Sequence, residues 1–417
     1  MKFVMSHNAT RLTLVALLGA VAWSPIASAA QLDVHPAAKG FSIIYQFPMN
    51  VSNYSNGGVA LDKKGNLFGA TYSGGANKFG DVYELMPAGG GYTFVDIHDF
   101  SGPGDGQYPT TGSPYLETKG SLNGNLYVTA SEGGAGNAGT AIRLSPSGGG
   151  YTETALFSFD TSDGAQPNAS FIASGKTLYT TTYAGGANGF GAIVALSPSN
   201  LSEKLLYSFS GLPSDGQSPT SNLVADTQGN LYGTTEMGGS GFGTFGSGTV
   251  FKFVPTKKGG KETVLWNFGA GSNDGEQPFA PPIMDSAGNL YGTTQFGGVG
   301  GLTHGVVWKL AASDGSYVES VLYSFGTANN DGAYPLGGLV LVGKTLYGTT
   351  SGGGATNNGT MFSISTTGTN YAILHDFDDN DGKSPEFSGW SVEGKTLYGT
   401  TGIGGTGGTG VVWKFVL

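Results

Sequence analysis

The sequence predicts an all-β protein, a seven-bladed β-propeller with four antiparallel strands per blade that is closed by an N-terminal strand. Three observations carry this prediction. One motif recurs seven times, four short strand-like runs surround each copy, and the two ends of the repeated region complement each other. A repeat of this length is the sequence sign of propellers and solenoids.

The recurring motif is a leucine followed by an aromatic residue. Successive copies lie 51 to 59 residues apart, at Leu67-Phe68, Leu126-Tyr127, Leu178-Tyr179, Leu231-Tyr232, Leu290-Tyr291, Leu346-Tyr347 and Leu397-Tyr398.

The strand-like runs are clearest around the fourth copy, at residues 222–226, 231–235, 248–253 and 262–268. Each run is rich in β-branched or aromatic residues and is bounded by Gly, Pro, Asp or Asn, which is typical of strands. No later stretch shows a sustained apolar period of 3.6 residues, so we expect few helices. Four antiparallel strands per unit are typical of a propeller blade.

The two ends of the repeated region complement each other. Residues 41–47 match the fourth run of other units, such as Leu205-Leu206-Tyr207-Ser208-Phe209, whereas residues 411–415 match a third run. We therefore expect residues 41–47 to pair with residues 411–415 in the seventh blade. This pairing closes the ring and removes an exposed sheet edge.

The N-terminus predicts export. Residues 1–29 resemble a secretory signal peptide. Lys2 and Arg11 precede an apolar run, and Ala27-Ser28-Ala29 is the expected cleavage site. The apolar run is too short to span a bilayer. We expect a flexible mature N-terminus at residues 30–40 and a single propeller domain at residues 41–417. The mature protein is expected to be secreted or periplasmic, without membrane insertion.

Composition excludes several classes of protein. The 75 glycines are frequent but follow no three-residue period, which excludes collagen. A hydrophobic content of 38% argues against disorder. The chain has no cysteine, which excludes thiol catalysis and cysteine metal sites. A net charge of −10 without a basic run argues against nucleic acid as a partner. We expect a monomer without a cofactor or a bound metal.

Four linked signatures suggest a family. They are Leu205-Leu206-Tyr207-Ser208-Phe209, Ser214-Asp215-Gly216-Gln217-Ser218-Pro219, Gly229-Asn230-Leu231-Tyr232-Gly233-Thr234-Thr235 and Gly359-Thr360-Met361-Phe362. They resemble the GloVer (choice-of-anchor) tandem-repeat family over residues 41–417. The resemblance implies export and a propeller-like repeat, and it brings no assigned reaction.

One face of the predicted ring carries the candidate site. In a meander, the loops from strand 2 to strand 3 and from strand 4 to the next strand 1 share a face. Six copies of Asp-Gly-x-x-Pro lie there, and the first unit lacks one; their aspartates are Asp105, Asp163, Asp215, Asp274, Asp331 and Asp381. A structural interpretation is a repeated turn, in which Asp accepts backbone N–H groups and Gly takes a positive φ. The alternative is a ring of carboxylates that binds cations or hydroxyl-rich ligands. Recurrence in six blades favours the turn.

Aromatic residues on the same face give a second group of candidates. They are Phe242 and Phe245 in the fourth Gly-rich loop, Phe296 and His304 in the fifth, and Tyr108 and Tyr334 within the Asp-Gly-x-x-Pro segments. Variable loops on a rigid scaffold often carry function. These side chains either stack on sugar rings or pack against neighbouring loops, and packing is the commoner outcome.

Other motifs are weaker. Residues 338–345 and 389–396 match a phosphate-loop pattern, but strands flank them where that loop requires a helix, so we reject both. The densest acidic cluster, Asp376 to Asp381, misses the calcium-loop spacing and leaves cation binding there as a minor alternative.

The leading functional hypothesis is therefore a non-enzymatic binding scaffold for a glycan or a cell-envelope protein, because no local catalytic motif is present. The alternative is an extracellular carbohydrate-active hydrolase or lyase that uses acids of this face, such as Asp274, Glu276 or Asp381.

Overall fold

The computed structural model describes residues 40–48, 52–55, 57–109, 112–241, 244–299, 303–386 and 389–417. The predicted signal peptide lies outside these ranges, as do residues 30–39 of the predicted mature N-terminus and Phe242 among the predicted site residues. The described residues belong to one compact unit, Ala37–Leu417.

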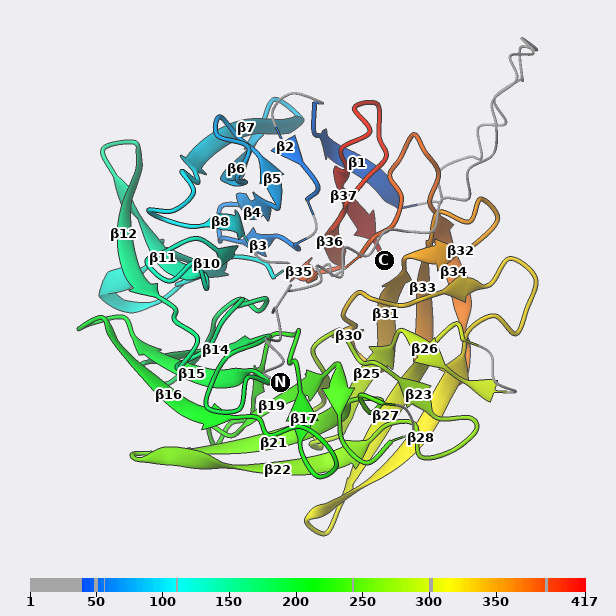
Figure 1. Ribbon diagram of the computed structural model, residues 1–417. Coiled ribbons are helices and arrows are strands. Elements are labelled where there is room, and N and C mark those ends of the chain that lie inside the picture. Colours follow the sequence, from blue (N-terminus) through cyan, green and yellow to red (C-terminus); the bar gives the residue numbers. More distant parts are fainter. Residues whose placement is uncertain are drawn as a thin grey trace, which may run out of the picture. The chain divides into compact units, whose positions relative to one another are not determined.

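Seven antiparallel sheets follow one another around a ring and form the blades (Figure 1). Blade 1 has β3 (Ala60–Leu61), β4 (Leu67–Thr71), β6 (Asp81–Ala88) and β7 (Gly91–Asp99). Blade 2 has β9 (Tyr115–Leu116), β10 (Leu126–Glu132), β11 (Thr140–Ser147) and β12 (Gly150–Ser158), with β8 (Gln107–Pro109) also pairing with β10 and the short 3₁₀ helix η1 (Gly120–Leu122) before β10. Blade 3 has β13 (Ile172–Ser174), β14 (Thr177–Thr182), β15 (Ala192–Ser197) and β16 (Ser202–Ser208).

The remaining blades repeat this order. Blade 4 has β18 (Val224–Ala225), β19 (Leu231–Thr235), β21 (Thr249–Thr256) and β22 (Gly259–Asn267). Blade 5 has β24 (Ile283–Met284), β25 (Leu290–Thr294), β27 (Val306–Ser313) and β28 (Ser316–Ser324). Blade 6 has β30 (Val340–Val342), β31 (Thr345–Thr350), β33 (Thr360–Ser365) and β34 (Ala372–Asp376). Blade 7 has β35 (Ser391–Glu393), β36 (Thr396–Thr401), β37 (Val411–Val416) and β1 (Phe41–Gln46).

The seven-bladed fold is thus as the sequence predicts, whereas some strand ends differ. In blade 4 the third strand continues to Thr256 and the fourth begins at Gly259, because their hairpin extends past the core with Pro, Lys and Gly residues that do not signal a strand. The first rejected phosphate-loop match lies in the β30–β31 hairpin, where no helix follows.

Ring closure by the N-terminal strand is confirmed. Strand β1 lies beside β37 (Figure 1) and pairs with it antiparallel, with Phe41 opposite Phe415 in the register. Past the end of β1, the backbone N–H of Phe47 donates to the carbonyl of Gly410 at 3.2 Å. The first and last segments of the repeat therefore form one blade, in which β37 is paired on both sides and β1 is the outer strand.

The core of each blade depends on size complementarity between strands 2 and 3. In five blades a glycine of strand 2 stands opposite an aromatic residue of strand 3; the pairs are Gly69–Tyr83, Gly233–Phe251, Gly292–Trp308, Gly348–Phe362 and Gly399–Trp413. A Cβ atom on Gly233 would lie 2.6 Å from Cζ of Phe251, so the ring covers the glycine. Blades 2 and 3 use Val128–Ile142 and Thr180–Val194 instead, which fill the same space with two medium side chains.

Buried threonine hydroxyls join neighbouring blades close to the inner strands. In six blades a strand-2 threonine contacts a backbone carbonyl of the next blade at 2.7–3.3 Å; the bonds run from Thr129 to Ala169, Thr181 to Ser221, Thr234 to Ala280, Thr293 to Gly337, Thr349 to Pro385 and Thr400 to Gly57. Blade 1 has Ala70 at this position. Each such bond gives a carbonyl of the next blade a hydroxyl donor, at a gain of about 1 kcal/mol.

Among the described residues, no helix has the length and apolar character needed to cross a membrane.

We expect Gly233→Val to lower the free energy of unfolding by about 1–3 kcal/mol, because the added methyl groups overlap the Phe251 ring. Adding Phe251→Ile to the same chain should restore part of the loss, since Val128 and Ile142 fit this position in blade 2. Denaturant unfolding followed by circular dichroism measures both. A double variant that is no more stable than Gly233→Val contradicts the complementarity.

The N-terminal strand should contribute as much as any other outer strand. Phe47 and Phe209 are both fully buried, and each ring lies 5.2 Å from an aromatic ring of the next blade, Tyr83 or Phe251. Phe47→Ala and Phe209→Ala should each cost about 3–5 kcal/mol of unfolding free energy. A cost for Phe47→Ala far below that for Phe209→Ala would mean that the N-terminal strand is not integrated into the ring.

Candidate functional site

The Asp-Gly-x-x-Pro segments and the strand 2–3 loops lie side by side on one face, which we call the motif face. In six blades a short ladder or bridge joins the two, and in blade 1 the equivalent segment, which lacks the motif, pairs in the same way. The pairs are β2 (Ser52–Asn53) with β5 (Ser73–Gly74), β8 with β10, Ala165 with Ala184, β17 (Gly216–Gln217) with β20 (Met237–Gly238), β23 (Gly275–Glu276) with β26 (Phe296–Gly297), β29 (Gly332–Ala333) with β32 (Gly352–Gly353), and Lys383 with Ile403. The shared face expected from meander geometry is therefore present.

The motif aspartates fold back onto their own turns. Each carboxylate accepts a backbone N–H from three to five residues upstream, with donors Ser101, Asp160, Ser210, Ala270, Thr327 and Asp378 for Asp105, Asp163, Asp215, Asp274, Asp331 and Asp381. Burial raises the pKa of Asp274, while N–H groups of Ala270 and Gly275 oppose the rise. Among the described residues, no group of three close ligand atoms contains two motif aspartates. The geometry is that of the predicted turn.

A second partner for these aspartates comes from the end of strand 4. Tyr207 and Tyr323 donate their hydroxyls at 2.8 Å to Asp215 and Asp331. In blades 1 and 6 a histidine takes this place, with His98 Nε2 at 3.2 Å from Asp105 and His375 Nε2 at 3.0 Å from Asp381. The exposed Glu153 of blade 2 brings a carboxylate within 4.8 Å of the His98–Asp105 pair. Sequence reasoning missed this link, although its signal is the recurring aromatic-x-Phe at the end of strand 4.

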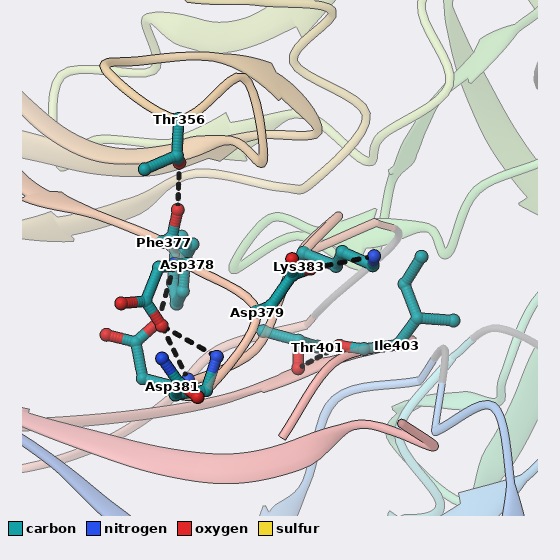
Figure 2. Close-up of polar contacts among 9 residues, drawn as sticks. Thr356, Phe377, Asp378, Asp379, Asp381, Lys383, Thr401 and Ile403 are labelled. Atoms are coloured by element: carbon teal, nitrogen blue, oxygen red, sulfur yellow. Dashed lines mark hydrogen bonds and ion pairs between the residues drawn. The ribbon is translucent and has the colours of Figure 1, made fainter. Parts of the chain in front are cut away.

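The acidic cluster at residues 376–381 is also a turn (Figure 2). The carboxylate of Asp378 accepts the N–H groups of Asn380 and Asp381, Asp381 in return accepts the N–H of Asp378, and Asp379 pairs with Lys383 at 2.8 Å. The side chains thus point to separate partners, and the cation site considered from the sequence gains no support from this arrangement.

The residue before the motif proline connects each segment to the preceding blade. It has a positive φ of 49–59° in the six units that carry the motif, at Tyr108, Gln166, Ser218, Gln277, Tyr334 and Ser384, and Tyr54 has a φ of 62° at the equivalent position of the first unit. This conformation directs N–H groups at the preceding strand 2–3 loop, as in the 2.8 Å bond from Tyr108 to the carbonyl of Phe79. Tyr54 adopts it without the Asp-Gly-x-x-Pro motif, so the ring rather than the motif imposes it.

Aromatic side chains gather at two junctions of the motif face. Between blades 1 and 2, Tyr108 stacks on Tyr72 with ring centroids 4.9 Å apart, and Phe79 packs edge-on at 6.4 Å. Sequence reasoning selected Tyr108 and missed the other two, because Tyr72 and Phe79 belong to a loop of the preceding blade.

The second aromatic group lies between blades 5 and 6. Tyr334 stacks on His304 at 5.7 Å and meets Phe296 edge-on at 5.9 Å. The structure therefore brings together three residues that the sequence selected separately. Tyr54, Tyr72 and Phe245 expose 49%, 38% and 61% of their surface, so aromatic area remains open to solvent on this face.

A buried glutamate also lies on this face. Glu236, directly after β19, is only 9% exposed, and its burial raises its pKa to about 7 while a hydrogen bond from Tyr183 opposes the rise. Glu276, an acid proposed from the sequence, is exposed in β23. Sequence reasoning missed Glu236 because its only distinction is burial.

The ring axis holds little space. A cavity of about 30 Å³ is lined by residues of blades 2 to 7, including Asn168, Thr220, Phe279 and Leu336. This volume accommodates one or two water molecules and is roughly a tenth of a typical small-molecule site. A ligand larger than a few water molecules therefore does not fit in this cavity.

Solved structures of similar fold are distant in sequence. Two candidate 6-phosphogluconolactonases, from Bacteroides uniformis and Bacteroides fragilis, are 16% and 15% identical, cover 84% and 80% of this chain and 87% and 86% of their own chains, and have TM-scores of 0.49 and 0.50. TolB from Acinetobacter baumannii is 15% identical, covers 72% of this chain and 60% of its own, and has a TM-score of 0.41. Such likeness concerns the fold alone. No curated protein matches the chain.

A family model matches most of the chain. The model of the Gloeobacter/Verrucomicrobia repeat matches residues 29–244, 110–281 and 240–417, and so spans all seven blades. Together with the repeated junctions described above, this match shows that the chain belongs to the Gloeobacter/Verrucomicrobia repeat family.

Proposed function

We propose that this protein is an exported, non-enzymatic binding scaffold of the cell envelope that holds a glycan on its motif face. The observation that carries the proposal is the pair of aromatic groups at the junctions of blades 1–2 and 5–6. Sugar rings present flat C–H faces that pack on exposed aromatic rings, and aromatic side chains are rigid and amphipathic anchors. Such groups on rigid loops are a common form of recognition surface.

The state of the acids supports binding over chemistry. The motif aspartates accept hydrogen bonds from their own turns, which leaves few carboxylate oxygens for a reaction. The axial cavity of about 30 Å³ is too small for a sugar, so the ligand lies across the surface. A net charge of −10 disfavours polyanionic ligands, so the proposal favours a neutral glycan.

We expect the double variant Tyr72→Ala and Tyr108→Ala to weaken glycan binding about tenfold or more, because the stacked pair offers the exposed ring surface. A glycan array that includes envelope polysaccharides identifies the ligand, and calorimetry measures its affinity. Val318→Ala, an exposed apolar change on β28, is the matched control and should bind normally. Absence of binding across the array, or unchanged affinity of the double variant, contradicts the proposal, and capture of only an envelope protein favours a protein ligand.

A carbohydrate-active enzyme is the second candidate, and Glu236 is the observation that favours it. A carboxyl with a pKa of about 7 is suited to donate a proton near neutral pH. If the protein hydrolyses a polysaccharide, we expect Glu236→Gln to abolish turnover and the wild-type rate to fall as the pH rises through 7. Glu276→Gln, which changes an exposed acid of the same face, is the matched control and should stay active. Turnover that survives Glu236→Gln excludes this role.

A further inference from the structure

Three glutamates occupy the same register position in the outer strands of consecutive blades. Glu203 in β16, Glu262 in β22 and Glu319 in β28 stand opposite Leu196, Phe253 and Leu310 of the adjacent strand. Each is partly buried, and its Oε1 atom is shielded from solvent without a hydrogen-bond partner among the described residues. We call them the junction glutamates, because each interacts electrostatically with the motif aspartate of the preceding blade.

Blade 6 shows what this position can do. There Tyr371, the residue before β34, donates its hydroxyl to Oδ1 of Asp331 at 2.8 Å. The same oxygen accepts the N–H of Gly332 at 2.9 Å, and Oδ2 accepts the hydroxyl of Tyr323. The motif aspartate thus receives a proton donor from the following blade as well as from its own turn.

The junction of blades 3 and 4 has a similar arrangement, but there Oδ2 of Asp215 also accepts the hydroxyl of Ser210, and the position of Tyr371 holds no hydroxyl donor. Oδ1 of Asp215 accepts the N–H of Gly216 at 2.7 Å, and Oδ2 accepts the hydroxyl of Tyr207. Glu262 stands where blade 6 has Tyr371. An ionised carboxylate cannot donate a hydrogen bond, whereas a protonated carboxyl carries one O–H donor. A proton on Glu262 would therefore place an O–H donor at the register position from which Tyr371 donates to Asp331.

We propose that the junction glutamates are protonated in the folded ring near neutral pH and donate this proton toward the motif aspartates. The ring then carries bound protons at three consecutive junctions, between blades 2 and 3, 3 and 4, and 4 and 5. Its cohesion depends on pH, because loss of each proton adds a negative charge that is repelled by a motif aspartate.

The surroundings of the three side chains agree with this arrangement. Burial, followed by repulsion from acidic neighbours, raises the pKa of Glu203 to about 7, of Glu262 to about 8 and of Glu319 to about 7. The titratable groups that face them are Asp163 and Asp160 for Glu203, Asp215 and Tyr207 for Glu262, and Asp274 for Glu319. All of these neighbours are acids or phenols, so none favours the ionised glutamate.

The direction of the pH effect follows from linkage. The folded state binds these protons more tightly than the unfolded chain does, so the stabilisation is complete at low pH and is lost as the pH rises through 7 to 8. Between pH 6 and pH 9, a group with a folded pKa near 7 raises the unfolding constant about tenfold.

The test compares the wild-type protein with the triple variant Glu203→Gln, Glu262→Gln and Glu319→Gln. Glutamine has the same shape and carries permanent N–H donors, so it mimics the protonated acid. We expect the triple variant to be more stable than wild type at pH 9. The ratio of its unfolding constants at pH 9 and pH 6 should be at least a hundredfold smaller than the same ratio for wild type. Acid–base titration of the folded proteins should show that wild type takes up about three more protons than the variant when the pH is lowered from 9 to 6.

Two controls separate the proposal from general effects of charge. Glu153→Gln, at the same register position of blade 2 but exposed, should leave the pH dependence unchanged. Tyr371→Phe removes a donor that stays protonated throughout, because burial and Asp331 raise its pKa, so it should destabilise the ring equally at pH 6 and pH 9. Asp96, Glu236 and Glu386 also have raised pKa values, so the unfolding free energy of every variant keeps some dependence on pH.

Equal pH dependence and proton uptake in wild type and triple variant would overturn the proposal, as would a triple variant less stable than wild type at pH 9.

Discussion

Each blade buries its two faces against its neighbours, because a single four-stranded sheet has apolar side chains on both sides and no second layer of its own. The contact between blades is therefore the interaction on which the rest of the structure depends. It consists of aromatic side chains such as Phe209 and Phe251, packed 5.2 Å apart across a junction, and of threonine hydroxyls paired with carbonyls of the next blade. With N-terminal strand β1 completing blade 7, every blade has two neighbours, and the junctions form a closed series.

The Asp-Gly-x-x-Pro segment belongs to this series of junctions. Its aspartate holds the turn, its left-handed residue directs an N–H at the preceding loop, and its proline packs against a glycine of the preceding blade, as Pro278 does against Gly248. A motif that performs these tasks in six blades has little freedom to bind a ligand. The capacity for recognition lies instead with side chains that differ between blades, such as Tyr72 and Tyr108 at one junction and Phe296 and Tyr334 at another.

The fold could be predicted from the sequence because the same pattern of strands and turns recurs in seven units. The Leu-aromatic pair, the turn residues and the unmatched runs at the two ends each predict one feature of a closed ring. The repeat does not indicate which side chains of different units meet at the candidate site. Tyr108 could be selected from its own loop, but its partner Tyr72 lies in another blade, and no spacing in the chain indicates that the two rings stack. Glu236 and the junction glutamates were missed for a related reason, since burial distinguishes them from the exposed Glu153 and Glu276.

By itself, the sequence determined the all-β class, the number of blades, the phase of the repeat and the pairing that closes it. These features depend on local strand and turn preferences and on periodicity, which short stretches of chain encode. Only the tertiary structure decided which side chains meet across a junction, which glutamates are buried, and that the axial cavity is too small for a sugar. Those outcomes depend on contacts between segments about 50 residues apart, whose distances and burial exist only once neighbouring blades are packed.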